Sequence, residues 1–227
     1  MRDSFAKNIL FFLQNLDLEI HPSHDVEVMN PFKDRLTFST CQKFYRKFYD
    51  DTTPRQIILG INPGRFGGGV TGIPFTDPIR LSENCRIENP FQKKQELSSL
   101  FIYEMIEAFG GADEFYKKFY ITAVSPLGFT KEKKNFNYYD DKSFERAIQD
   151  FVIRALEQQL NFGIDRKIAF CLGEGKNFKY LSKLNDERQY FERIVPLPHP
   201  RFIMQYRLKK KSEYIERYLR ELKRRPI

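Results

Sequence analysis

The segment from Leu59 to Phe75, LGINPGRFGGGVTGIPF, constrains the fold of this chain more than any other segment. It follows the apolar run Ile57–Leu59, which is typical of a buried parallel strand. The sixteen residues after Leu59 include six glycines and two prolines, and that density indicates a shaped backbone rather than a generic loop. Open α/β sheets bind ligands at such loops, beyond the carboxyl end of a central strand. This segment, with the amide of Asn62 just beyond the strand, is therefore the first candidate for an active site.

The apolar pattern predicts strands at 56–61, 119–124, 167–172 and 193–197, and helices at 4–17, 39–49, 97–109, near 113, at 143–160, from 176, and at 210–223. Residues 20–37 are predicted to be loop, and residues 129–140 a polar, aromatic loop. Alternation of strands and helices indicates a mostly parallel sheet with helices on both faces. We therefore expect one α/β domain over residues 1–227, with three layers (α/β/α) around a central four-stranded, mainly parallel sheet.

An unusual loop follows each predicted strand, and these loops contain Asn62, Ser125, Gly175 and His199. The carboxyl ends of parallel strands share one edge of a sheet, so we expect these four residues to face one crevice. His199 stands between two prolines, which restrict the backbone on both sides of it. A lone histidine is usually structural, but one held rigidly at this edge is a catalytic candidate.

The formal net charge of +8 favours a polyanionic partner, with nucleic acid as the first candidate. A soluble protein that is merely basic is an equally good interpretation of the charge alone. Many of the cations lie in the predicted last helix, where they also fit a solvated face. No apolar run approaches the roughly 20 residues that a membrane-spanning helix needs, so we expect no membrane segment.

Cofactor motifs are missing from the two glycine-rich turns. GINPG lacks both the GK[ST] ending of a phosphate-binding loop and the glycine spacing of a dinucleotide loop. GEGK, at 173–176, begins a predicted helix whose amides suit a phosphate, although a plain strand–helix turn is the better explanation of this segment alone. Cys41, Cys85 and Cys171 are far apart and form no CxxC pair, which argues against a metal site and favours free thiols in a reducing cytoplasm.

Together these segments resemble the uracil-DNA glycosylase superfamily, and most closely a divergent, bacterial-type member of its single-strand-selective monofunctional branch. The first motif of that branch, GMNPGPFG…TGVPF, is matched at Gly60, Asn62, Pro63, Gly64, Phe66, Gly67, Thr71, Gly72, Pro74 and Phe75. HPRF at His199 resembles the family's HPSPR motif, residues 122–127 resemble a strand ending HNLCPL, and residues 173–176 resemble a GVGR turn. The matches follow the family's order over roughly residues 28–204.

The resemblance implies a monofunctional DNA glycosylase of base excision repair, which hydrolyses the N-glycosidic bond of uracil or another deaminated base flipped out of DNA. Asn62 would position the water that attacks the sugar C1′, and His199 would donate a hydrogen bond to the base O2 as negative charge develops there. Phe75 would stack under the flipped base. No metal or organic cofactor is expected. The implied substrate contacts are Gly60, Ile61, Pro63, Gly64, Phe66, Gly72, Phe75, Ser125 and Asn137, and the implied DNA contacts are Arg65, Lys176 and Arg201.

Two departures from the family pattern affect the expected substrate. Ala123 stands where the family has the asparagine that recognises the uracil edge. Base selection then rests on Ser125, Asn135, Asn137 or backbone groups, or the substrate is another base. HPRF also lacks two residues of HPSPR, so the loop that wedges into DNA is shortened or rebuilt, with residues 201–202 as candidates for the wedge and a phosphate contact.

Two other function classes stay open at this point. One is a catalytically inactive, nucleic-acid-binding relative that lost base recognition at Ala123. The other is a hydrolase of free nucleosides. The basic last helix disfavours it, because a free nucleoside has no phosphates for these cations to contact. We expect a monomer that binds single- or double-stranded DNA in the cytoplasm, away from membranes.

Overall fold

Four parallel strands form the central sheet in the order β3–β2–β6–β7. The computed structural model describes residues 3–224 and gives these strands as β2 (Arg55–Gly60), β3 (Phe119–Ala123), β6 (Ile164–Leu172) and β7 (Arg193–Leu197). β3 is buried at every position because helices cover both faces of the sheet. The predicted three-layer fold with a four-stranded parallel sheet is confirmed.

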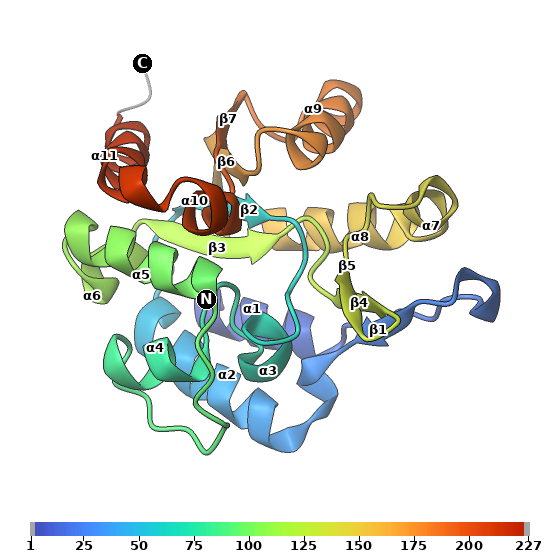
Figure 1. Ribbon diagram of the computed structural model, residues 1–227, viewed down its shortest axis with the longest axis horizontal. Helices are drawn as coiled ribbons and strands as arrows, with labels where there is room; N and C mark the ends of the chain where they lie inside the picture. The colour runs from blue at the N-terminus through green and yellow to red at the C-terminus, as the bar shows by residue number, and fades with distance from the viewer. Residues whose placement is uncertain (1–2, 225–227) are drawn as a thin grey trace.

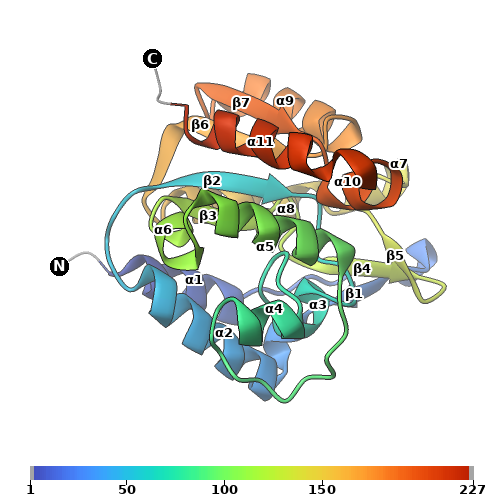
Figure 2. The same ribbon diagram turned by 60° about the vertical axis from the view of Figure 1, so that its left-hand side comes forward.

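Helices cover the two faces of the sheet (Figure 1). α1 (Phe5–Gln14), α2 (Arg35–Tyr49) and α8 (Gln149–Leu160) belong to one face, where the hydroxyls of Tyr120 and Thr122 on β3 donate to Gln159 of α8. α9 (Lys176–Arg188), α10 (Pro200–Tyr206) and α11 (Lys211–Leu222) lie on the opposite side (Figures 1 and 2). α5 (Leu97–Phe109) packs against α10 and α11, and this contact brings the start of α5 close to the carboxyl ends of the strands.

A second, three-stranded antiparallel sheet lies beside the strand ends, in the order β1–β4–β5. Its strands are β1 (Glu27–Met29), β4 (Gly128–Lys131) and β5 (Lys134–Phe136). The prediction that residues 20–37 and 129–140 are loops is therefore wrong for these short strands. In the turn between β4 and β5, Glu132 and Lys133 have positive φ. Glycine or asparagine usually occupies such positions and marks a hairpin in a sequence, and neither is present here.

Other helix predictions differ from the structure in detail. The predicted helix 143–160 is two helices, α7 (Lys142–Ala147) and α8, that meet at Ile148. α2 begins before the predicted residue 39, because the side chain of Asp34 accepts the N–H of Thr37 and caps the helix there. The remaining helices are α3 (Gly68–Thr71), α4 (Pro78–Glu83), α6 (Ala112–Tyr116) and the 3₁₀ turns Pro22–His24, Pro31–Lys33 and Leu208–Lys210.

The last helix, α11, is close to its predicted bounds. Some of its basic side chains pair with carboxylates of neighbouring elements: Lys211 with Glu104 and, at 2.6 Å, Arg217 with Glu174. These pairs support the interpretation of α11 as a solvated, ion-paired face. Within residues 3–224, the helices are all too short or too polar to cross a membrane.

Candidate active site

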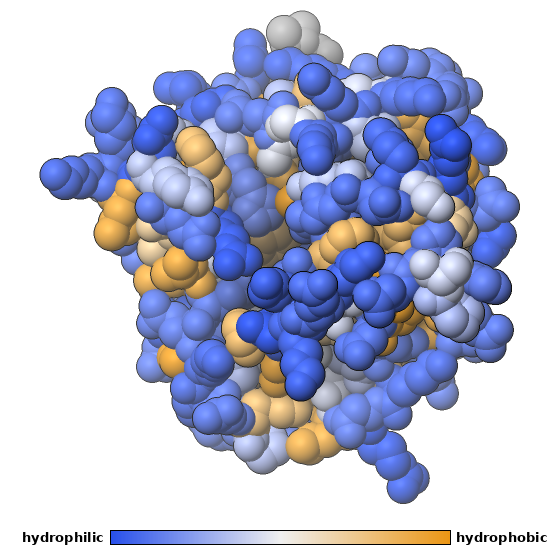
Figure 3. Space-filling model, turned by 45° about the vertical axis from the view of Figure 1, so that its right-hand side comes forward, coloured by the Kyte–Doolittle hydropathy of each residue, from blue (hydrophilic) through white to orange (hydrophobic). Residues whose placement is uncertain are grey.

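A cavity of about 330 Å³ opens beyond the carboxyl ends of β2, β3 and β7. Figure 3 turns these strand ends towards the viewer and shows a hollow on a mainly hydrophilic face. The volume falls within the roughly 300–1,000 Å³ of small-molecule sites. The cavity brings together eight of the residues predicted from the sequence: Ile61, Asn62, Pro63, Gly64, Phe75, Asn137, His199 and Arg201.

Two backbone groups next to β5 hold the amide of Asn62 in one orientation. Its Nδ2 donates to the carbonyl oxygen of Phe136 at 3.2 Å, and the N–H of Tyr138 donates to its Oδ1 at 3.2 Å. Because a donor and an acceptor meet the two ends of the amide, the oxygen and nitrogen of Asn62 are distinguished by their partners. A carbonyl oxygen has two lone pairs, so Oδ1 keeps one for a further donor such as water.

Behind Asn62, a buried hydrogen-bond chain joins the hairpin to the central sheet. The hydroxyl of Tyr138, whose side chain is fully buried, donates to Oδ1 of Asn177 at 2.8 Å. Nδ2 of Asn177 in turn donates to the carbonyl oxygen of Leu172 at 3.1 Å, at the end of β6. The chain therefore connects the segment that orients Asn62 to the end of a neighbouring strand.

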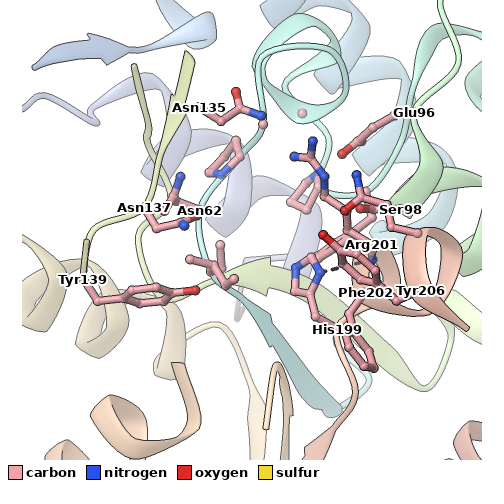
Figure 4. A pocket seen from close by; sticks show the side chains of 18 residues that line it. Asn62, Glu96, Ser98, Asn135, Asn137, Tyr139, His199, Arg201, Phe202 and Tyr206 are labelled. Carbon is pink, nitrogen blue, oxygen red and sulfur yellow. Dashed lines mark hydrogen bonds between the residues drawn. The ribbon is translucent and has the colours of Figure 1, made fainter. Parts of the chain in front are cut away.

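His199 lies across the cavity from Asn62 (Figure 4). It caps α10, and its Nδ1 accepts the backbone N–H of Arg201 at 3.2 Å. Burial, together with the nearby charge of Arg201, lowers the pKa of His199 to about 4. The imidazole is therefore neutral at pH 7, and because Nδ1 is an acceptor, Nε2 carries the proton. His199 thus offers a neutral Nε2–H donor.

The ring of Phe75 provides an apolar surface beside this donor. Its centroid lies 6.1 Å from that of His199, and its backbone has a positive φ of 53°. A Cβ at Gly60 would lie 2.7 Å from the ring, so only glycine lets Phe75 lie over the end of β2. Ala123, at the end of β3, adds a second apolar lining residue. A flat ring flanked by a polar donor suits an aromatic, polar ligand.

Other predicted residues lie outside this cavity. Gly60 is beneath Phe75, and Gly72 packs against Cys41 and Phe32 with a φ of 71°. The fully buried hydroxyl of Ser125 donates to the carbonyl oxygen of Leu127 at 2.8 Å. Gly60, Gly72 and Ser125 therefore support the walls, and a substrate contact at any of them stays a prediction.

Three further predicted residues stand at the edges of the site. Arg65 and Phe66 line a second, adjoining cavity, and their side chains stack with 4.4 Å between the guanidinium carbon and the ring centroid. Lys176 begins α9, with its ammonium 5.7 Å from the ring of Tyr139, which lines the first cavity. Arg65 and Phe66 thus lie beside the adjoining cavity, and Lys176 lies beside a residue of the first; their DNA and substrate contacts stay predictions.

Sequence reasoning missed several lining residues. Glu96 and Ser98 come from the start of α5, and Tyr139, Gln205 and Tyr206 also line the cavity. The exposed rings of Phe202 and Tyr206, four positions apart on α10, have centroids 5.8 Å apart. That spacing was a usable signal for Tyr206, since residues four apart share a helix face. Glu96 and Ser98 carry no local pattern.

The side chains of residues 3–224 include no group of three or more His, Cys, Asp or Glu arranged to hold a metal ion. The three cysteines are free and buried, as predicted. Burial raises the pKa of the Cys171 thiol to about 12, so the thiolate needed for a nucleophile or a metal ligand is disfavoured at neutral pH.

The chain is similar to known proteins in sequence and in fold. The family model of the uracil DNA glycosylase superfamily matches residues 46–223. Among solved structures, the chain is similar to the crystal structure of wild-type Pedobacter heparinus SMUG2, with 47% identity, 97% of each chain covered and a TM-score of 0.94. No curated protein matches the chain. The family match includes Asn62, Phe75 and His199.

Proposed function

This chain belongs to the uracil-DNA glycosylase superfamily and is a DNA glycosylase, and we propose that two of its side chains, Asn62 and His199, carry out the reaction. That reaction is the hydrolysis of the N-glycosidic bond of the substrate nucleotide. The observation that carries this proposal is the position of the two side chains on opposite walls of one cavity (Figure 4). The substrate is a flipped-out uracil or another deaminated base, and the products are the free base and an abasic site.

Asn62 orients the attacking water. Its Oδ1 has one lone pair left after accepting the N–H of Tyr138, and that lone pair accepts a hydrogen bond from water. The amide is held at both ends, so little orientational freedom is lost when the water binds. The water oxygen forms the new bond to the sugar C1′ as the C1′–N bond breaks, and the electron pair of that bond leaves with the base. The proton that the water loses passes to solvent, and the departing base takes up a proton from solvent, so that the products are the abasic site and the neutral free base.

His199 stabilises the leaving base. Its Nε2–H points to the developing negative charge on a base carbonyl oxygen, and the imidazole is a donor in its neutral form. A preorganised donor of this kind typically contributes about 10²–10³ in rate. Because the proton stays on Nε2 across neutral pH, this role requires no titration of the side chain.

The target base must leave the stack before it reaches this cavity, at a cost of a few kcal/mol. Stacking on Phe75 offsets part of that cost, since the ring is already fixed over Gly60. Single-stranded DNA avoids the unpairing cost, so we expect it to be the better substrate. Arg65 and Arg201 line the two cavities and Lys176 lies beside Tyr139 at the edge of the first, so these three cations are the proposed phosphate contacts.

Base selection rests on groups other than residue 123. Ala123 contributes no hydrogen bond, whereas Asn135 and Asn137 both line the cavity. Nδ2 of Asn137 donates to Asp140 at 2.9 Å, which leaves its Oδ1 for a base N–H. Oδ1 of Asn135 accepts the N–H of Arg65, so its Nδ2 remains the donor for a base carbonyl.

We further propose that the protein acts as a monomer in the cytoplasm. One cavity of this chain contains both catalytic side chains, so no second subunit is needed to complete the site. The three buried free thiols fit a reducing compartment.

A base-release assay tests the proposal. Purified protein is mixed with single- and double-stranded oligonucleotides carrying uracil, xanthine or hypoxanthine, with chelator and no added metal, and abasic sites are measured. We expect release that vanishes with Asn62→Ala, falls strongly with His199→Ala, and is unchanged in the surface control Asn161→Ala. Full activity of Asn62→Ala contradicts the mechanism. DNA binding with no release from any substrate favours a binding-only relative.

A further inference from the structure

A second cavity, of about 370 Å³, adjoins the base cavity. Glu96, Ser98, Asn135 and Arg201 line both, so the two are continuous. Its volume is again in the range of roughly 300–1,000 Å³ that small-molecule sites occupy. A strand whose flipped base fills the first cavity therefore has a second compartment next to it.

Three of the nine residues that line the second cavity are cations. Arg65, Lys134 and Arg201 line it, and the ammonium of Lys94 lies 3.8 Å from the ring centroid of Phe66, another lining residue. Lys134 and Arg201 are exposed and free to turn towards a ligand. Such a lining attracts a phosphate group, through charge-assisted hydrogen bonds.

Glu96 is the one acidic side chain that lines this cavity within the described residues. Gly67 makes room for its side chain, because a Cβ at that position would overlap Oε2. No ion pair within 4.0 Å joins its carboxylate to a cation of residues 3–224. Its backbone N–H donates to Asp77 at 2.9 Å, and its carboxyl group accepts a hydrogen bond from Ser98, which leaves further lone pairs on the two oxygens. The carboxyl group is therefore available to a ligand.

We propose that the second cavity binds the nucleotide next to the flipped-out one in a single strand, and that Glu96 favours a base with an exocyclic amino group over thymine. This inference rests on the proposed function. Carboxylates accept hydrogen bonds from the amino group of cytosine, whereas thymine presents a carbonyl oxygen at the same position. The cations hold the phosphate that links the two nucleotides, and Glu96 selects the neighbouring base.

The preference depends on the protonation of Glu96. Burial raises the pKa of this carboxyl to about 7; the charge of Asp77 adds to the rise, and Arg201 and a hydrogen bond from Ser98 oppose it. Above that pH the carboxylate only accepts hydrogen bonds and selects amino groups; below it, the protonated acid donates a hydrogen bond and tolerates thymine O4.

The charged groups around Glu96 are Asp77 at the start of α4, Arg201 on α10, Lys134 on β5, Arg65 in the glycine loop and Lys94 before α5; His199 is neutral.

Single-turnover base release tests this site. The substrates are single strands that carry the base released in the first assay, with each of the four nucleotides on its 5′ side and then on its 3′ side. On one side we expect cytosine to exceed thymine at least about fivefold at pH 8 and less than about twofold at pH 6. Glu96→Gln removes the preference at both pH values, and the exposed control Glu216→Gln keeps it.

Rates within twofold for every neighbour on both sides, or a preference that persists in Glu96→Gln, overturn the proposal. Failure of the proposed function is a separate result, because then no substrate releases a base. In that case the same strands are compared by fluorescence anisotropy, where the fivefold preference is expected in Kd at pH 8. Equal Kd values for all four neighbours overturn the site.

Discussion

The backbone N–H of Tyr138 donates to Oδ1 of Asn62 at 3.2 Å, although 76 positions of sequence separate the two residues. The segment after β5 thus fixes an amide at the end of β2. Because this partner is a backbone N–H, replacing the side chain of Tyr138 leaves the donor in place. The orientation of Asn62 therefore depends on where this segment of backbone lies. The buried contacts of Tyr138 decide that position.

Replacement of Asn62 by alanine removes the water-orienting oxygen. We expect the base-release rate to fall at least about 10²-fold, because the attacking water loses the group that positions it. The side chain is half-buried and its partners are backbone groups, so the thermal midpoint changes little. Rapid-quench measurement of abasic sites, beside the thermal unfolding of both proteins, separates the two effects. A loss of activity that merely follows unfolding contradicts the assignment.

Tyr138→Phe removes the hydroxyl that bonds to Asn177 and keeps the ring. We expect kcat to fall roughly tenfold with KM little changed, because the backbone that holds Asn62 shifts while DNA contacts stay intact. Leaving Oδ1 of Asn177 without its donor costs about 1–3 kcal/mol of unfolding free energy. Tyr180→Phe, on a neighbouring ring, is the matched control. Equal effects of the two variants on kcat at saturating DNA argue against a positioning role.

The sequence predicts a site residue when the residues next to it in the chain determine its position. The loop from Leu59 to Phe75 was predictable because an apolar strand followed by dense glycine has one main structural meaning. His199 was predictable because two prolines stand around it at the end of a strand. The hairpin of β4 and β5 was missed, since its turn, at Glu132 and Lys133, carries no glycine signal.

The position of Glu96 is not encoded locally at all. It stands before α5, and packing of that helix against α10 and α11 carries it to the glycine loop some thirty residues earlier in the chain. Ser125 is the opposite case, since its position after β3 suggested a site residue while its hydroxyl bonds to Leu127. Position along the chain predicts which edge of the sheet a residue reaches, and only packing decides where its side chain points.

The pH dependence of stability tests the state of His199. Its pKa is about 4 in the folded protein and near 6.5 when unfolded, so between these values only the unfolded chain takes up the proton. The contribution of His199 to the unfolding free energy therefore falls as the pH drops from about 6.5 to 4, whereas the raised pKa of Glu96, about 7, contributes in the opposite direction. Urea denaturation at pH 7 and pH 5 measures the His199 contribution by comparison: removal of the imidazole in His199→Gln is expected to make the unfolding free energy at pH 5, relative to pH 7, higher than in the parent protein. The exposed control His21→Gln behaves like the parent protein; an unchanged pH dependence in His199→Gln counts against a neutral, half-buried imidazole.

Gly60 and Phe75 are coupled, because a Cβ at position 60 would lie 2.7 Å from the Phe75 ring. Gly60→Ala alone must push the ring out of place, and we expect base release to fall at least about tenfold. Phe75→Leu replaces the ring by a smaller, flexible side chain and lowers activity by itself, through lost stacking. In that background, Gly60→Ala has little left to displace, so its further effect is less than about twofold. Single-turnover rates of the four proteins form a double-mutant cycle, in which neighbours that touch give a non-additive result. Simple additivity of the effects of the two substitutions on the rate means that the position of the Phe75 ring does not depend on the glycine beneath it. Another contact then fixes the ring in the base cavity.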